Sequence, residues 1–179
     1  TKEEADAEAA KDGSTYVEDA GRGYRKVVPS PMPKEIVEKE AVRALVEADV
    51  LTICSGGGGI PVVAEDGQYV GVEAVNDKDF SARVLAENVD ADRLIILTGV
   101  DNIYINYNQP DQKALEQISV AEAEEYIKEG HFAAGSMLPK IEAALDFVKG
   151  DDKRKAIITS IENLENIDKE AGTVISQKG

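Results

Sequence analysis

The sequence of 179 residues contains no Trp, three Phe, one Cys and one His. Because Cys54 is the only cysteine, a disulfide within the chain is excluded, and Cys54 with His131 is too small a set for a Cys/His zinc site. No apolar run reaches the length of a membrane span. Lys and Arg number 20 against 35 Asp and Glu, a formal net charge of −15. Such an acidic chain repels nucleic acid and anionic membrane, so we expect it to bind neither.

Apolar residues make up 42% of the chain and charged residues 31%, which is typical of a globular protein with a core of its own. The length suits one domain or two small lobes. The N-terminus, TKEEADAEAAKDG, is acidic and polar, unlike a signal peptide, and it lacks an initiator Met. We therefore expect a cytoplasmic protein and a chain that begins within a longer polypeptide.

Helix signals recur along the chain. Residues 2–11 predict a short charged helix closed by Gly13, and prolines at 29, 31 and 33 favour extended backbone in the connector that follows. Apolar stripes predict helices over 33–49 and 79–88. Ser119 with Glu122 forms a capping box for a helix ending at Gly130, and Ser136 is a candidate cap for the next helix.

Strand signals alternate with these helices. Three β-branched runs, 50–54, 93–100 and 155–160, predict strands buried on both faces. A hairpin is predicted over 62–72 and a last strand over 172–176. The alternation indicates an α/β fold, a three-layer α/β/α sandwich with a mainly parallel sheet. Since ligands bind beyond the carboxyl ends of such strands, the loops after the buried strands are where we expect function.

Four glycines in a row follow the first predicted strand. Gly56, Gly57 and Gly58, with Gly59, expose backbone N–H groups and allow close approach of an anion, as in phosphate-binding nests. The alternative is a flexible turn. The run matches neither of the two common nucleotide-binding fingerprints.

Two lysines stand at predicted helix starts. Lys78 and Asp79 open one helix, where a lysine can neutralise phosphate and a carboxylate can hold it in place, or where both can form a surface capping cluster. Lys140 follows Gly135 in the first turn of another helix, which suits a phosphoryl oxygen but also fits a solvated lysine.

The loop LTGVDNIY (97–104) ends a buried strand and has two interpretations, a cradle for base and ribose or a plain connection. His131 has no Ser or Cys partner pattern, so a structural role is favoured over a catalytic one. Cys54 is most simply a small core residue.

Seven segments resemble the carbamate kinases of the amino acid kinase family, and they occur in the family's order. They are EDAGRGYRKVVPSP (18–31), SGGGGIPV (55–62), GVEAVNDKDF (71–80), IILTGVD (95–101), INYNQPDQ (105–112), GHFAAGSMLPKIEAA (130–144) and AIITSIENL (156–164). Asn76 and Gly99 depart from the family's usual residues, and neither change touches the lysines.

The resemblance implies reversible phosphoryl transfer between ATP and carbamate, giving ADP and carbamoyl phosphate with Mg²⁺, at the end of arginine breakdown, in a homodimer. It implies that Lys78 and Lys140 neutralise the transferring group, that Asp79 orients them, and that Gly56, Gly57 and Gly58 border the acceptor pocket. The nucleotide side would be lined by Gly99, Val100, Asp101 and Tyr104, with Gly135, Ser136 and Met137 near the phosphates.

One departure concerns the N-terminal side. The family begins with a strand, a GGN loop and a lid-like subdomain, which are not found here. The resemblance therefore implies that residues 1–25 are a remnant of the lid with its connector, that residues 26–179 form the nucleotide-binding lobe, and that the sheet is incomplete on its N-terminal side. The missing half is then a candidate partner. Two alternatives stay open: a related kinase with another acceptor, such as an acidic amino acid or UMP, and a noncatalytic nucleotide-binding module.

Overall fold

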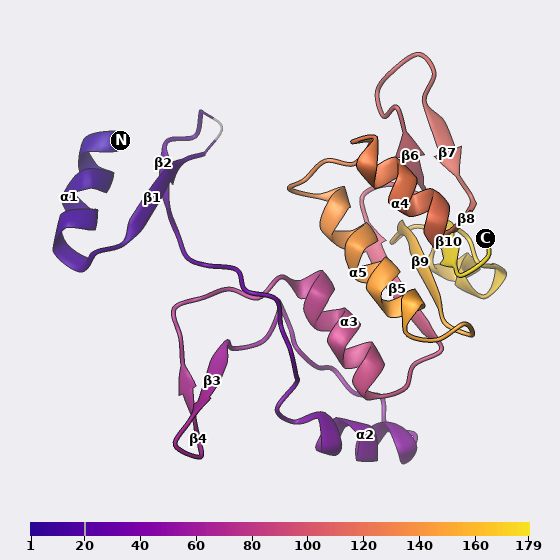
Figure 1. The fold of residues 1–179 in the computed structure, drawn as a ribbon, viewed down its shortest axis with the longest axis horizontal. Coiled ribbons are helices and arrows are strands. Elements are labelled where there is room, and N and C mark those ends of the chain that lie inside the picture. The colour runs from indigo at the N-terminus through magenta and orange to yellow at the C-terminus, as the bar shows by residue number, and fades with distance from the viewer. Residues whose placement is uncertain (20) are drawn as a thin grey trace.

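The computed structural model describes residues 1–19 and 21–179; Ala20, inside the 18–31 segment, lies outside the described residues. A four-stranded sheet in the order β5-β9-β10-β8 forms the centre of the fold (Figure 1). Its strands are β5 (Arg93–Thr98), β9 (Lys155–Ser160), β10 (Thr173–Ser176) and β8 (Gln117–Ser119). The β5–β9 and β10–β8 pairs are parallel and the β9–β10 pair is antiparallel, so the sheet is mixed.

Three helices cover the sheet. The helices α3 (Lys78–Asn88) and α5 (Met137–Lys149) pack on each other and contact β5, and α4 (Val120–Lys128) packs on α5 and β8. The apolar face of α5 is the centre of the core, because Ile141 and Val148 have no exposed surface. The predicted α/β class is confirmed, as are the helices at 79–88 and behind Ser119, where the capping box forms.

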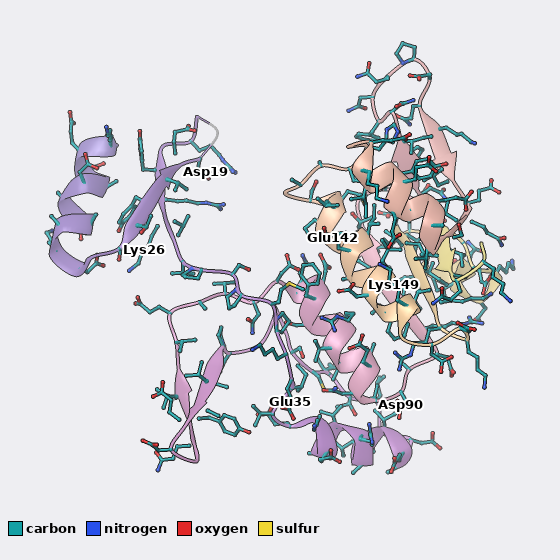
Figure 2. The ribbon with its side chains drawn as sticks, in the orientation of Figure 1. Asp19, Lys26, Glu35, Asp90, Glu142 and Lys149 are labelled. Atoms are coloured by element: carbon teal, nitrogen blue, oxygen red, sulfur yellow. The ribbon has the colours of Figure 1, made fainter. Side chains whose placement is uncertain are left out.

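The chain enters this core through peripheral elements. Helix α1 (Lys2–Asp12) ends at Gly13 as predicted and packs on the hairpin of β1 (Thr15–Glu18) and β2 (Tyr24–Val27), apart from the sheet (Figure 1). Nζ of Lys26, which Figure 2 labels on the hairpin, lies 3.2 Å from Oδ2 of Asp12 in α1. Ser14 and Lys26 donate to Asp12, which lowers the pKa of that carboxyl to about 2.

Further short elements complete the chain. The predicted hairpin at 62–72 is confirmed as β3 (Val62–Glu65) with β4 (Gln68–Gly71). A second hairpin joins β6 (Ile103–Ile105) and β7 (Lys113–Leu115), and a 3₁₀ helix, η1 (Leu164–Lys169), precedes β10. No helix in the described part of the chain is both long and apolar enough to cross a membrane.

Three predicted elements differ from the structure. Residues 50–54 do not form a strand, and Leu51 and Ile53 are 96% and 95% exposed, since no neighbouring strand pairs with them. The strand β5 is buried on one face only, with Leu94 buried and Ile95 40% exposed. The helix predicted over 33–49 is confined to α2 (Lys39–Glu47), because the segment after the prolines stays irregular.

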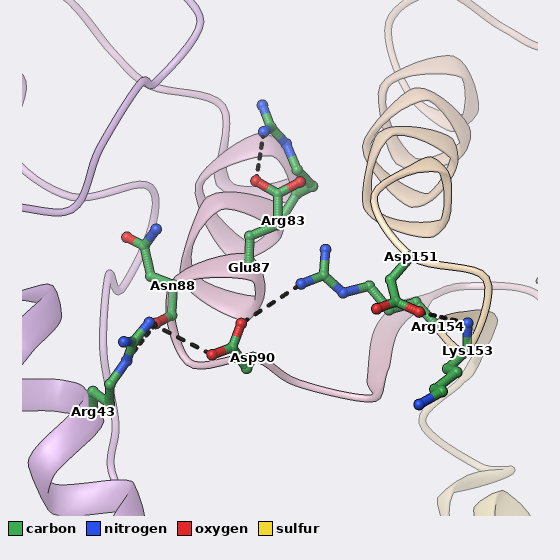
Figure 3. Close-up of polar contacts among 8 residues, drawn as sticks. All are labelled: Arg43, Arg83, Glu87, Asn88, Asp90, Asp151, Lys153 and Arg154. Atoms are coloured by element: carbon green, nitrogen blue, oxygen red, sulfur yellow. Dashed lines mark hydrogen bonds and ion pairs between the residues drawn. The ribbon is translucent and has the colours of Figure 1, made fainter.

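Helix α2 is attached to the end of α3 by a polar contact (Figure 3). Arg43 donates from Nε and Nη2 to the carbonyl oxygen of Asn88, at 3.1 and 2.5 Å. Asp90 lies 3.7 Å from Arg43 and 3.9 Å from Arg154, which follows α5. Because the Asp90 side chain is 77% exposed, these ion pairs add little, and the bonds to the Asn88 carbonyl anchor α2.

Candidate active site

Two lysines from different helices converge on one carboxylate. Asp77 caps α3, its side chain accepting from the backbone N–H of Asp79 at 2.7 Å, which fixes the first turn of this helix. Oδ2 of Asp79 accepts from Nζ of Lys140 at 2.7 Å and from Nζ of Lys78 at 3.3 Å. The structure therefore brings together the three residues expected to be catalytic.

The two ammonium groups differ in exposure. The Lys140 and Asp79 side chains are 11% and 7% exposed, so they form a buried pair, whereas that of Lys78 is 59% exposed. Partial burial lowers the pKa of Lys78, but the carboxylates of Asp79 and Asp77 outweigh this and raise it overall. Lys78 is thus a cation at neutral pH that presents its charge toward solvent.

The glycine-rich loop rests on the same helix turn. Ser81, 1% exposed, donates from Oγ to the carbonyl oxygen of Gly58 at 2.9 Å. Gly58 has a φ of +130° and lies against the backbone of Asn76. The first turn of α3 therefore holds both the loop and the lysine cluster. Nothing in the sequence pattern links Ser81 to the loop, so sequence reasoning missed it.

The loop offers backbone donors to an anion. The N–H of Gly56 donates to the carbonyl of Cys54 at 2.7 Å, and that of Gly58 to the carbonyl of Ser55 at 2.8 Å. Within the described residues, the N–H groups of Gly57 and Gly59 have no hydrogen-bond partner. Two donors of the predicted nest are thus available for a ligand oxygen.

Replacing Gly58 with alanine is expected to displace this loop. The added Cβ would lie 2.3 Å from the carbonyl oxygen of Asn76, in a backbone conformation that side chains rarely adopt. We expect a cost of about 1–3 kcal/mol in the free energy of unfolding, measured by urea denaturation. Gly57→Ala is the matched control, because a Cβ there meets nothing within 4 Å and φ is not positive. Equal stability of the two variants would contradict the assigned contact.

A cavity of about 320 Å³ lies at the carboxyl end of β5 and the start of α5. Its lining includes five residues of the expected nucleotide side: Gly99, Val100, Tyr104, Ser136 and Met137. The other lining residues are Thr98, Tyr107, His131, Phe132 and Ala133. Among these, Tyr107, His131 and Phe132 were missed, although they lie within the motifs at 105–112 and 130–144.

Four of the five glycines expected in the site do not line this cavity. Gly135 and the loop glycines Gly56, Gly57 and Gly58 are absent from its lining.

Asp101 also stays outside the cavity lining. Its Oδ1 accepts from Oγ of Ser160 at 2.5 Å, and its carbonyl oxygen accepts from Oγ1 of Thr159 at 3.3 Å. Asp101 thus ties the loop after β5 to the end of β9, while its contact with nucleotide stays a prediction.

The first turn of α5 connects the cavity to the lysines. Ser136 is the N-cap residue as predicted, but its side chain makes no capping hydrogen bond. The N–H of Leu138 donates to the carbonyl oxygen of Ala133 and Pro139 has no N–H, so an anion at this end is favoured by the N–H of Met137 and the positive end of the helix dipole. Ser136 and Met137 line the cavity, and Lys140 follows within the first turn and a half. A nucleotide in the cavity could therefore direct its phosphates toward Lys140 and Lys78.

The arrangement suits a phosphorylated ligand. Two ammonium groups, a helix N-terminus and glycine N–H groups are donors of the kind that stabilise charge on phosphoryl oxygens. Among the described residues, no group of three or more His, Cys, Asp or Glu side chains is placed to hold a metal ion.

Comparison with known proteins agrees with this geometry. Residues 4–160 match the amino acid kinase family. The chain is 56% identical to carbamate kinase 1 of Enterococcus faecium, over 97% of this chain and 56% of that protein, and 55% identical to the carbamate kinase of Clostridium perfringens, over 91% and 52%. The carbamate kinase from Giardia lamblia bound to AMP-PNP superposes with a TM-score of 0.88 at 45% identity, over 98% of this chain and 55% of that one.

The chain spans about half the length of the curated relatives that it matches. Within that half, the match runs through the glycine loop, the lysine cluster and the cavity, and it includes most of the chain. From the extent of this match, the chain belongs to the amino acid kinase family.

Proposed function

We propose that this chain is the nucleotide-binding part of a carbamate kinase, which transfers a phosphoryl group reversibly between ATP and carbamate. The observation that carries the proposal is the pair Lys140 and Lys78 on Asp79, on two helices of which α3 holds the glycine loop and α5 begins at the cavity. Sequence identities of 56%, 54% and 55% to carbamate kinases of three bacteria support carbamate as the acceptor.

In the direction of ATP formation, an oxygen of the β-phosphate of ADP attacks the phosphorus of carbamoyl phosphate. The bond between phosphorus and the carbamate oxygen breaks, and carbamate leaves with the electron pair. Such a reaction needs positioning and charge stabilisation more than covalent help from the protein. Lys140 and Lys78 would offset the charge on the transferring group, and Asp79 would hold both ammonium groups in place.

Mg²⁺ fits this site as a companion of the nucleotide. Mg²⁺ is commonly held by substrate phosphates with few protein carboxylates. Asp79 is already engaged by two lysines, which agrees with a metal carried mainly by the nucleotide phosphates. When bound, the ion would offset negative charge on the phosphates.

The relatives' additional length bears on the fold. We propose that residues 1–25 are the remnant of a lid, that residues 26–179 are the nucleotide-binding lobe, and that the missing half completes a three-layer sandwich. The exposed apolar side chains of Leu51, Ile53 and Ile95 are the surface that such a half would cover. A homodimer, a cytoplasmic location and a role at the end of arginine breakdown also belong to this proposal.

A second candidate is a noncatalytic nucleotide-binding module. It is favoured by one observation, that the chain matches only about half of each catalytic relative. This candidate keeps the cavity and gives the lysines a binding role only.

Two measurements test the proposal. The 179-residue chain is expected to bind ADP in calorimetric titration, but to form ATP from ADP and carbamoyl phosphate slowly. A second protein is a fusion, in which the N-terminal segment of the Enterococcus faecium relative precedes the 179-residue chain. This joined protein is expected to form ATP readily. No binding of ADP would contradict the nucleotide site. Binding without phosphoryl transfer in the joined protein would favour the noncatalytic module, and preference for UMP or a glutamate derivative would change the acceptor.

A further inference from the structure

His131 lines the cavity, and residues that do not line the cavity fix the orientation of its ring. Nε2 is 3.0 Å from Oε2 of Glu129, and the ring meets Tyr126 edge-on with centroids 5.8 Å apart. Its backbone N–H donates to the carbonyl oxygen of Tyr126 at 3.2 Å. The side chain is 20% exposed. The end of α4 therefore holds this imidazole in one place at the cavity wall.

The contact with Glu129 determines which ring nitrogen carries the proton. An ionised carboxylate can only accept hydrogen bonds, so Nε2 must be the donor. In the neutral imidazole, Nδ1 is then unprotonated and has a lone pair. His131 thus has one remaining polar atom for a ligand, a hydrogen-bond acceptor.

The rest of the cavity wall suits a flat, uncharged group. Tyr104, Tyr107 and Phe132 supply aromatic surface, and none of the lining residues is Lys, Arg, Asp or Glu. An aromatic base can stack on such surfaces, but stacking does not distinguish one purine from another. Discrimination between purines needs a directed polar group such as the lone pair of His131.

We propose that His131 is a specificity-determining residue of the cavity, whose Nδ1 accepts a hydrogen bond from the 6-amino group of a bound adenine. This inference rests on the proposed nucleotide site. A purine with a 6-oxo group, such as hypoxanthine, offers an acceptor at the same place and would face the lone pair of Nδ1. Both the bond gained by adenine and the repulsion of the oxo group favour ADP over IDP.

The test compares the affinities of ADP and IDP for the 179-residue chain by calorimetry at about pH 8. We expect the native chain to prefer ADP about tenfold. His131→Phe keeps an aromatic ring against Tyr126. We expect it to lower the affinity for ADP about fivefold and to bring the ratio of ADP affinity to IDP affinity close to one. His131→Gln offers both a carbonyl and an amide, so it should keep ADP affinity and gain IDP affinity.

Glu129→Gln tests the protonation argument separately. An amide at this position can donate to Nε2, which lets Nδ1 carry the proton and become a donor. The ratio of ADP affinity to IDP affinity should then fall in this variant, while its thermal stability stays that of the native chain.

The possible failures are distinguishable. A chain that does not bind ADP overturns the proposed nucleotide site and this inference with it. Normal ADP binding with an unchanged ADP-to-IDP ratio in His131→Phe overturns the inference alone. An equal loss for both nucleotides in that variant also overturns it, because it shows a structural role without selectivity.

Discussion

Replacement of Lys140 by methionine is expected to lower the rate of phosphoryl transfer by about a hundredfold or more while the fold is kept. The ammonium of Lys140 is buried and held 2.7 Å from Asp79, so its position costs no reorganisation as charge develops on the phosphoryl group. Methionine keeps most of the side-chain volume without the charge. Asp79 retains Lys78 at 3.3 Å, so its carboxylate is not left without a partner.

The measurement is carbamoyl phosphate-dependent ATP formation by the joined protein described above. Lys149→Met is the matched control, the same substitution on the same helix. The side chain of Lys149, labelled in Figure 2, is 44% exposed and pairs with Glu124. That control should retain full turnover. An equal rate in the native protein and in Lys140→Met would remove this residue from the catalytic machinery.

Local sequence signals predicted local structure well. Three predicted features depend on residues a few positions apart: the capping box of Ser119 and Glu122, the end of α1 at Gly13 and the hairpin at 62–72. Such interactions form wherever the segment lies in the fold. For this reason the corresponding helices and hairpin appear in the structure close to their predicted bounds.

Strand prediction failed where a partner was needed. The run at 50–54 has the composition of a buried strand, yet Leu51 and Ile53 are almost fully exposed. A strand is stabilised by hydrogen bonds and side-chain contacts with its neighbours, which the segment itself cannot supply. The outward face of β5, with Ile95 and Leu97 partly exposed, shows the same lack of a covering element.

The site was predictable to the extent that motifs carry it. Lys78, Asp79 and Lys140 were expected together from the family resemblance, and the structure places their charged groups in contact. Ser81 and His131 were not expected at the site, because their roles arise from contacts that the fold creates. Ser81 bonds to a loop 23 residues away in the sequence, and His131 lies in the cavity wall. No periodicity in the sequence marks such contacts.

Loss of the Asp79 carboxylate is expected to destabilise the chain by roughly 3 kcal/mol, because Asp79→Ala leaves the buried ammonium of Lys140 without its counter-charge. The chain alone suffices for the measurement, the free energy of unfolding in urea at neutral pH. Glu35→Ala is the control, since Glu35 and Lys39 form an exposed pair, with side chains 61% and 37% exposed. Breaking that pair should cost no more than about 0.5 kcal/mol.

A second substitution separates the charge from the volume of the missing side chain. If an unpaired buried charge causes the loss, adding Lys140→Met to Asp79→Ala should restore much of the stability, because no charge is then left buried at this site. If the loss comes from packing alone, the two substitutions should add. A double variant less stable than Asp79→Ala would show that Lys140 does not depend on Asp79 for its place in the core. The ion pairs with Asp79 would then not explain why the two ammonium groups lie together.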